Sequence, residues 1–175
     1  TESDVFYCLG DMIDRGPSSL DTIKVIRALP NCTVLMGNHE QLALQALAPD
    51  ADMEAQFMWQ INGGDATLAE LKTLSEEEYR ELVNWLPALP LYAIVEVQGR
   101  DFVLVHAGVK SNDFLVPTSW DKASLEQYLS NQSENDLLWI REDFWQNPTD
   151  FRTSDASYPI VICGHTPTPL LESFG

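Results

Sequence analysis

The sequence predicts an α/β fold, and three observations lead to that prediction. Short apolar runs that end at glycine alternate with segments whose apolar residues recur at helical spacing. The first such passage reads strand, helix, strand, which is a parallel crossover unit. Each histidine of the chain follows an apolar run. Because open α/β sheets bind ligands at the carboxyl ends of their strands, we expect the functional groups there.

The first half of the chain opens with this crossover unit. DVFYCLG (4–10) predicts a buried strand, and TVLMG (33–37) predicts a second one. Between them, SSLDTIKVIRAL (18–29) predicts a helix that a serine caps and Pro30 ends. Four further helices are expected from the periodicity: HEQLALQAL (39–47), DMEAQFMWQ (52–60), ATLAELKTL (66–74) and SEEEYRELVNWL (75–86), the last opened by a capping box of Ser75 and Glu78.

The second half begins with a predicted hairpin. LYAIVEV (91–97) and DFVLVHAG (101–108) are joined at residues 98–100, where Gln98 and Gly99 favour a tight turn. Two helices are expected at 122–130 and 134–145, and PIVICGHTP (159–167) predicts one more buried strand. No internal repeat or low-complexity linker interrupts the sequence, so we expect a single domain over 1–175.

Composition narrows the function further. The formal net charge is -17, and Lys and Arg form no cluster, which argues against a nucleic-acid partner. No apolar stretch reaches the roughly 20 residues of a membrane span, and no signal peptide is visible. We therefore expect a soluble, cytoplasmic protein with no membrane partner, whose oligomeric state stays open.

The histidines are the most informative residues of the chain. His39 follows TVLMGN, His106 follows FVLV, and His165 follows IVICG. Asp11 and Asn38 stand at two equivalent strand ends. Carboxylate, amide oxygen and imidazole together suit a divalent ion such as Mn²⁺, Fe²⁺ or Zn²⁺. Such sites often hold two ions that clamp a transferring phosphoryl group.

Four motifs carry a resemblance to a known family. GDMIDRG (10–16), GNHE (37–40), LVHAG (104–108) and CGHTP (163–167) resemble the successive motifs of the phosphoprotein phosphatase family, the binuclear-metal serine/threonine phosphatases, in its bacterial and phage-lambda-like branch. The resemblance runs from Gly10 to Pro167. It implies a calcineurin-like metallophosphoesterase fold, a layered α/β sandwich with the metal site at the carboxyl ends of the central strands.

The resemblance also implies a role for each motif residue. Asp11 would bridge two divalent ions. Mn²⁺ is the expected metal, and Fe and Zn are the alternatives. Asn38, His106 and His165 would complete the shell of one of them. His39 would be the general acid, oriented by Asp14.

Two arginines would bind the substrate's phosphate. Arg15 belongs to the first motif, and Arg141, in LLWIRED, resembles a second phosphate-binding arginine of the bacterial branch. The alternative interpretation is that Arg141 is an ordinary surface residue on a helix. Glu40 is expected to support its loop, Trp59, Trp85 and Trp145 to belong to the core, and Asn62 has no assigned chemistry.

The pattern departs from the family at both ends. No Asp-x-His motif precedes Gly10, and the chain stops soon after CGHTP, so we expect the first strand and the last strands of the family to be missing. Only one metal site is complete in the sequence as given.

The expected function is metal-dependent phosphomonoester hydrolysis by a metal-activated hydroxide, as in a serine/threonine protein phosphatase. The substrate would be a phosphorylated protein or a small phosphoester. One alternative is a diadenosine polyphosphate hydrolase of the same fold. Another is a non-catalytic, metal-binding remnant of that fold.

Overall fold

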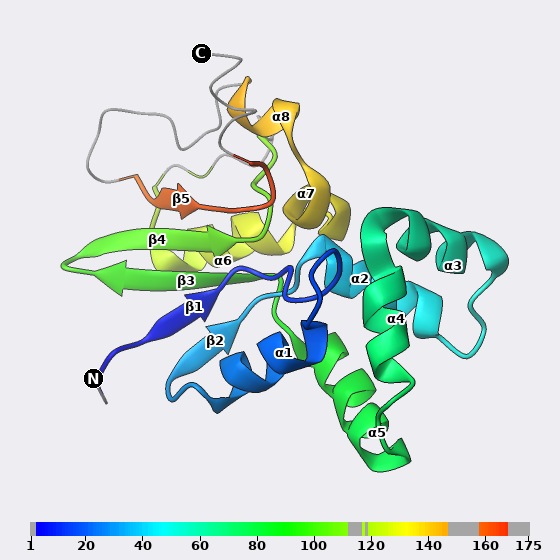
Figure 1. Cartoon of the computed structure of the whole chain (residues 1–175). Coiled ribbons are helices and arrows are strands. Elements are labelled where there is room, and N and C mark those ends of the chain that lie inside the picture. The colour runs from blue at the N-terminus through cyan, green and yellow to red at the C-terminus, as the bar shows by residue number, and fades with distance from the viewer. Residues whose placement is uncertain (1–2, 112–116, 118, 147–157, 168–175) are drawn as a thin grey trace. The chain divides into compact units, whose positions relative to one another are not determined.

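The computed structural model describes residues 3–111, 117, 119–146 and 158–167 (Figure 1). Two compact units follow one another along the chain, Thr1–Pro90 and Leu91–Gly175. Both mix strands with helices, as the predicted α/β class requires. That the whole chain forms a single domain stays a prediction.

The first unit contains the predicted crossover. Strand β1 (Phe6–Cys8) pairs in parallel with β2 (Cys32–Val34), and helix α1 (Ser19–Ala28) connects them. The prediction that the first strand is buried is wrong, because Phe6 and Tyr7 are 40% and 37% exposed. In the described residues β1 pairs with β2 alone, so it lies at the edge of a two-stranded sheet.

The helices that follow β2 agree with the predicted ones. They are α2 (Asn38–Leu47), α3 (Met53–Trp59), α4 (Asp65–Leu71) and α5 (Glu76–Trp85). The capping box at the start of α5 is confirmed, since Ser75 and Glu78 each bind the other's backbone N–H. A π-helical turn, η1 (Gln60–Gly64), which is kinked at the non-helical Gly63, joins α3 to α4. A short 3₁₀ turn, η2 (Leu86–Ala88), follows α5.

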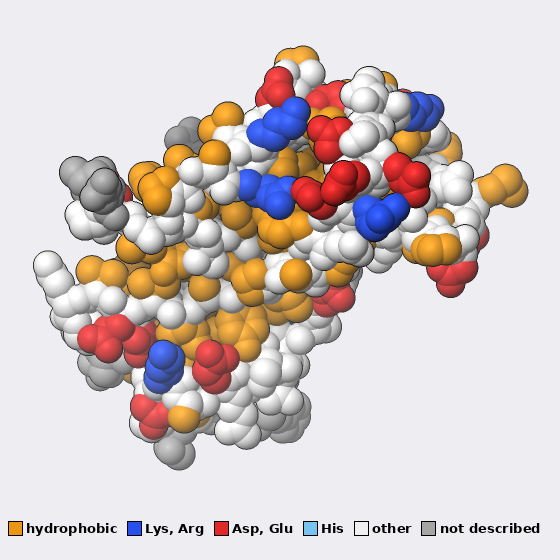
Figure 2. Space-filling view, turned by 90° about the horizontal axis from the view of Figure 1, so that it is seen from below, with side chains coloured by type: hydrophobic (Ala, Val, Ile, Leu, Met, Phe, Trp, Pro, Cys, Tyr) orange, Lys and Arg blue, Asp and Glu red, His pale blue; other side chains and the backbone are white. Residues whose placement is uncertain are grey.

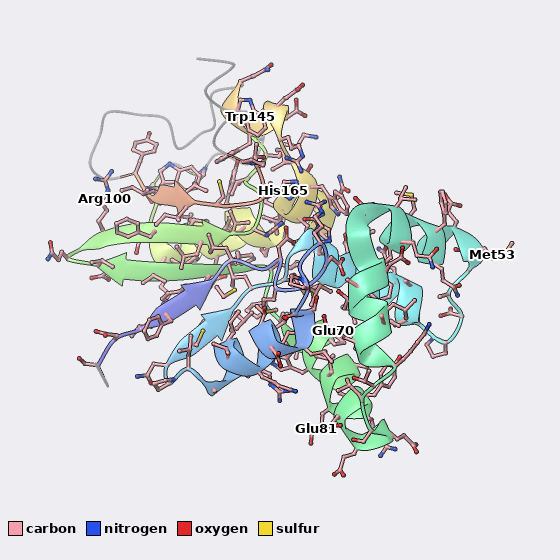
Figure 3. All side chains as sticks on the ribbon, viewed as in Figure 1. Met53, Glu70, Glu81, Arg100, Trp145 and His165 are labelled. Atoms are coloured by element: carbon pink, nitrogen blue, oxygen red, sulfur yellow. The ribbon has the colours of Figure 1, made fainter. Side chains whose placement is uncertain are left out.

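Helix α1 is capped in a way that its own sequence does not reveal. No side chain caps it at Ser18, contrary to the serine cap expected there. Instead, the Glu70 carboxylate accepts hydrogen bonds from the backbone N–H groups of Ser19 and Leu20, both at 2.9 Å. Figure 3 shows Glu70 between α4 and α1. A carboxylate from another helix thus satisfies backbone N–H groups that have no partner within α1.

The second unit is built on a three-stranded sheet in the order β3-β4-β5 (Figure 1). Strands β3 (Tyr92–Val97) and β4 (Arg100–Val105) form the predicted hairpin, and β5 (Ile160–Ile162) pairs in parallel with β4. Helix α6 (Lys122–Ser130) covers this sheet. Its Leu125 and Leu129 belong to the hydrophobic core, as do Val103 and Val105 of β4.

The helix predicted over residues 134–145 is two helices. Helix α7 (Glu134–Trp139) ends at Trp139, and α8 (Glu142–Trp145) begins after Arg141. Arg141 itself is not helical, with φ -130° and ψ -98°. The expectation that Arg141 lies within a helix is therefore wrong, and the break turns the chain at this residue.

Two further features of the described residues concern the charges on the surface and the lengths of the helices. Figure 2 shows a face where Lys and Arg side chains lie beside Asp and Glu side chains around exposed hydrophobic groups. Among the described residues, no helix is both long and apolar enough to cross a membrane.

Candidate functional site

The loop after β1 has an unusual backbone. Asp11, Asp14 and Arg15 have positive φ angles of 55°, 70° and 57°. His165, in the second unit, has φ 60°. Positive φ is uncommon outside glycine and often marks functional loops, because the surrounding structure must hold the strain. Four of the eight candidate site residues are thus among the six non-glycine residues with positive φ in the part of the chain that the structure describes.

Two glycines let the loops after β1 and β2 approach each other. A Cβ at Gly10, where φ is 88°, would overlap the backbone of Gly37. A Cβ at Gly37 would overlap the backbone of Asp11 and the carboxylate of Glu40. The glycines of GDMIDRG and GNHE are therefore required by this close contact.

Glu40 joins the two loops. Its side chain is fully buried, and its carboxylate accepts backbone N–H bonds from Asp11 at 2.8 Å, Met12 at 2.7 Å and Gly37 at 2.9 Å. Burial raises the pKa of the Glu40 carboxyl, while these backbone bonds favour its ionised form. The expectation that Glu40 supports the loop is confirmed.

Asp14 and His39 form a buried pair in the first unit. Nδ1 of His39 lies 2.7 Å from Oδ2 of Asp14. An ionised carboxylate can only accept, so His39 carries a proton on Nδ1 and leaves Nε2 for proton transfer. This is the contact that the resemblance implies for a general acid and the residue that orients it.

Two residues that the sequence did not reveal fix Asp14. The Trp59 indole N–H donates to Oδ2 at 2.9 Å, and the Thr67 hydroxyl donates to Oδ1 at 2.6 Å. The backbone N–H of Asp14 donates to the hydroxyls of Thr67 and Ser19. Trp59 is buried as expected but has a polar role as well. No motif marks these positions, because the contacts span 45 to 53 residues of sequence.

Arg15 is exposed and is held by the π-helical turn. Its Nε donates to the carbonyl of Asn62 at 3.2 Å, and its backbone N–H donates to the carbonyl of Gly63 at 3.2 Å. The terminal nitrogens of a guanidinium held through Nε can still bind an oxyanion. Asn62 thus acquires a structural role through its backbone.

His106 and His165 lie together in the second unit. Nε2 of His106 is 3.1 Å from Nδ1 of His165, and the backbone N–H of Gly164 donates to the carbonyl of His106 at 2.8 Å. Figure 3 labels His165 beside α7, whose last residue, Trp139, packs edge-on against its ring at 6.2 Å. Arg141 lies close by, because its Nη1 donates to the Thr166 hydroxyl at 3.2 Å.

The donors present suit a divalent metal. Two imidazole nitrogens 3.1 Å apart converge in the second unit. Within the first unit, Asp11 offers a carboxylate and Asn38, the first residue of α2, offers an amide, and the backbone N–H of His39 donates to Asp11 at 3.2 Å. Oxygen and imidazole ligands of this kind fit Mn²⁺, Fe²⁺ and Zn²⁺. The residues present therefore fit the metal that the sequence predicted.

The chain belongs to the calcineurin-like phosphoesterase family, whose model matches residues 1–175. The predicted fold is thereby confirmed. The finer prediction is a serine/threonine protein phosphatase, but curated relatives of this chain are named as another kind of phosphoesterase.

Several curated relatives share one name. A symmetrical bis(5'-nucleosyl)-tetraphosphatase of Erwinia tasmaniensis is 34% identical over 62% of this chain and 35% of its own length. Those of Aliivibrio fischeri and Aliivibrio salmonicida are 30% and 31% identical over 85% and 88% of this chain, and 49% and 51% of their own lengths. The chain thus spans about half the length of the relatives it matches, or less.

Proposed function

We propose that the protein hydrolyses dinucleoside tetraphosphates at the central phosphoanhydride bond. The observation that carries this choice of substrate is the shared name of the relatives, symmetrical bis(5'-nucleosyl)-tetraphosphatase. Cleavage at the centre of a tetraphosphate gives two nucleoside diphosphates. Water supplies the oxygen that bonds to phosphorus, and the bridging oxygen departs with the other diphosphate.

Asp11, Asn38, His106 and His165 would hold divalent metal in this proposal. A bound divalent ion supplies Lewis acidity and lowers the pKa of water. Arg15 and Arg141 would bind the phosphate oxygens, since a guanidinium fork matches an oxyanion and keeps its charge at any working pH.

His39 would act as the general acid through Nε2. Asp14 holds the His39 ring in place, because its carboxylate is fixed by Trp59 and Thr67 as well. A diphosphate is a less basic leaving group than a serine alkoxide, so it needs this proton less.

The Asp14–His39 pair therefore also favours a second candidate, the phosphomonoesterase that the resemblance implied. A general acid helps most when the leaving group is an alkoxide. Protein phosphatase activity and tetraphosphatase activity thus differ in how much they depend on His39.

The experiment that tests the proposal compares two substrates at matched concentration with Mn²⁺ present: diadenosine tetraphosphate and a phosphoserine peptide. We expect a higher kcat/KM for the tetraphosphate, and a smaller loss on it than on the peptide when His39 is replaced by Asn. Exclusive action on the peptide would overturn the proposal in favour of the second candidate.

A further inference from the structure

A hollow in the second unit lies beside Arg141. Its volume is about 430 Å³, within the range of roughly 300–1,000 Å³ that is typical of small-molecule sites. It lies along α7, the turn at Arg141 and the start of α8. Its lining consists of Lys110, Asn135, Asp136, Trp139, Ile140, Arg141, Glu142 and Asp143.

The Lys110 side of the hollow is held in place by several hydrogen bonds. The Gln132 amide oxygen accepts from the Lys110 N–H at 2.9 Å, and its amide nitrogen donates to the Lys110 carbonyl at 3.1 Å. The Tyr128 hydroxyl donates to the same carbonyl at 3.0 Å. The backbone beside the hollow is therefore preorganised, which lowers the entropic cost of binding.

Gly108 lies in close contact with Ile140 and Phe144, on either side of Arg141. A Cβ at this position would lie 2.7 Å from a ring carbon of Phe144 and 2.9 Å from a methyl carbon of Ile140. The absence of a side chain at Gly108 thus lets the segment around Arg141 pack against the loop after β4.

The chemistry of the lining changes along the hollow. Arg141 donates to Thr166, the residue after the candidate metal ligand His165. The Arg141 end of the hollow is therefore the end at which we expect a phosphate. Trp139, half-buried, offers an aromatic side chain on which a base could stack. Three carboxylates, those of Asp136, Glu142 and Asp143, outnumber the two basic groups. An acidic lining disfavours a further phosphate but suits the hydroxyl and amino groups of a nucleoside.

We infer that this hollow binds one nucleoside of the substrate, with the base against Trp139 and the adjoining phosphate at Arg141. The inference rests on the proposed function, since it assigns part of the same substrate to the second unit. Recognition of the nucleoside would then come from α7 and α8, and recognition of the phosphates from the motif residues.

The test is calorimetric binding of ADP and of pyrophosphate to the whole chain, because the two probes share the diphosphate and differ in the nucleoside. We expect the parent to bind ADP about tenfold more tightly than pyrophosphate. Trp139→Leu should abolish most of this preference, and Trp139→Phe should retain it. Trp85→Leu, which changes a half-buried tryptophan of the first unit, is the matched control and should leave the preference as in the parent.

Equal binding of both probes by the parent, or an ADP preference that survives in Trp139→Leu, would overturn the inference. So would a Trp139→Leu variant that loses affinity for a phosphoserine peptide and not for ADP, because the hollow would then accept polypeptide. These measurements need no turnover. Failure to hydrolyse diadenosine tetraphosphate would instead count against the proposed function, so the two failures are distinguishable.

Discussion

Asp14 and His39 are the residues whose chemistry the structure defines most closely. One oxygen of the Asp14 carboxylate accepts from His39 and Trp59, and the other accepts from Thr67. Asp14→Asn can turn its amide nitrogen toward the Thr67 hydroxyl, which is able to accept. The substitution therefore removes the charge beside His39 with little change in shape.

We expect Asp14→Asn and His39→Asn each to lower kcat on an alkyl phosphoester by roughly 10²–10⁴-fold. The double variant should be no worse than His39→Asn alone, since two residues that act as a unit are not additive. Steady-state kinetics of the four proteins measure this. Losses that multiply in the double variant would show that Asp14 acts independently of His39.

Glu40 and Glu70 both support the backbone of another segment, although Glu40 is fully buried and Glu70 is half-buried. Each uses its carboxylate to accept backbone N–H bonds, Glu40 from the loop after β1 and Glu70 from the start of α1. Replacing either by Gln puts an amide nitrogen against an N–H donor, at a cost of about 1–3 kcal/mol. Only Glu40 holds the backbone of the candidate metal ligand Asp11.

We therefore expect Glu40→Gln to weaken Mn²⁺ binding more than Glu70→Gln does, when calorimetric titration is carried out well below both unfolding temperatures. The unfolding free energies of the two variants provide the control for general destabilisation. Equal Mn²⁺ affinity in both variants would contradict the positioning role of Glu40.

At the residue scale, sequence could find the groups that motifs carry and not the groups that support them. His39 and Asp14 stand in short, specific motifs, so their proximity was expected. Trp59 and Thr67 hold the Asp14 carboxylate from 45 and 53 residues away, and no local pattern distinguishes such residues from ordinary core or surface positions.

At the element scale, the π-helical turn η1 is the feature that bears most directly on the site. Gly63 has φ 103°, and a Cβ there would lie 2.8 Å from Cγ of Arg15. Gly99, in the hairpin turn, has φ 77°, and a Cβ there would meet nothing within 4 Å. An alanine at either position would lower the free energy of unfolding by about 1–2 kcal/mol, because its backbone would be left-handed. Only Gly63→Ala would also displace Arg15.

Gly63→Ala should therefore raise the inhibition constant of inorganic phosphate several-fold, whereas Gly99→Ala should leave it near the parent value. Competitive inhibition of p-nitrophenyl phosphate hydrolysis measures both, and thermal unfolding reports their shared backbone cost. The same inhibition constant in both variants would show that Arg15 does not bind phosphate.

Helix α5 gives a prediction about pH. Hydrogen bonds from the Ser75 hydroxyl and backbone lower the pKa of the Glu78 carboxyl from its usual 4.5. The folded state therefore favours the ionised Glu78 carboxylate. This stabilisation is fully present above the usual pKa of 4.5 and is lost as pH falls through the lowered pKa of the folded state. We expect Glu78→Gln to flatten the decline in unfolding free energy between about pH 5 and pH 3. Glu77→Gln, at the adjacent exposed position, is the control, and an equal change in slope would contradict the assignment.

Sequence periodicity predicted the helices well and misjudged what interrupts or covers the elements. The break at Arg141 was missed because Leu137, Leu138 and Phe144 keep an apolar pattern across it. The exposure of β1 was missed because an apolar run does not show how many strands flank it. In both cases tertiary packing decides the outcome, and local sequence does not record it.

At the scale of the whole molecule, the family was predictable because its four motifs occur in order over most of the chain. The substrate was not, because the motifs concern metal and phosphate, which a protein phosphatase and a dinucleoside tetraphosphatase handle alike. What distinguishes these substrates is the group attached to the phosphate. In this chain no residue of the four motifs lines the hollow that we propose for the nucleoside.

The measurement that tests the central claim most directly is chromatographic analysis of diadenosine tetraphosphate after incubation with the chain, with and without Mn²⁺. The account predicts two ADP for each tetraphosphate consumed, only when Mn²⁺ is present, and almost none from the Asp11→Asn variant. No Mn²⁺-dependent release of ADP by the parent, or equal release by Asp11→Asn, would contradict it.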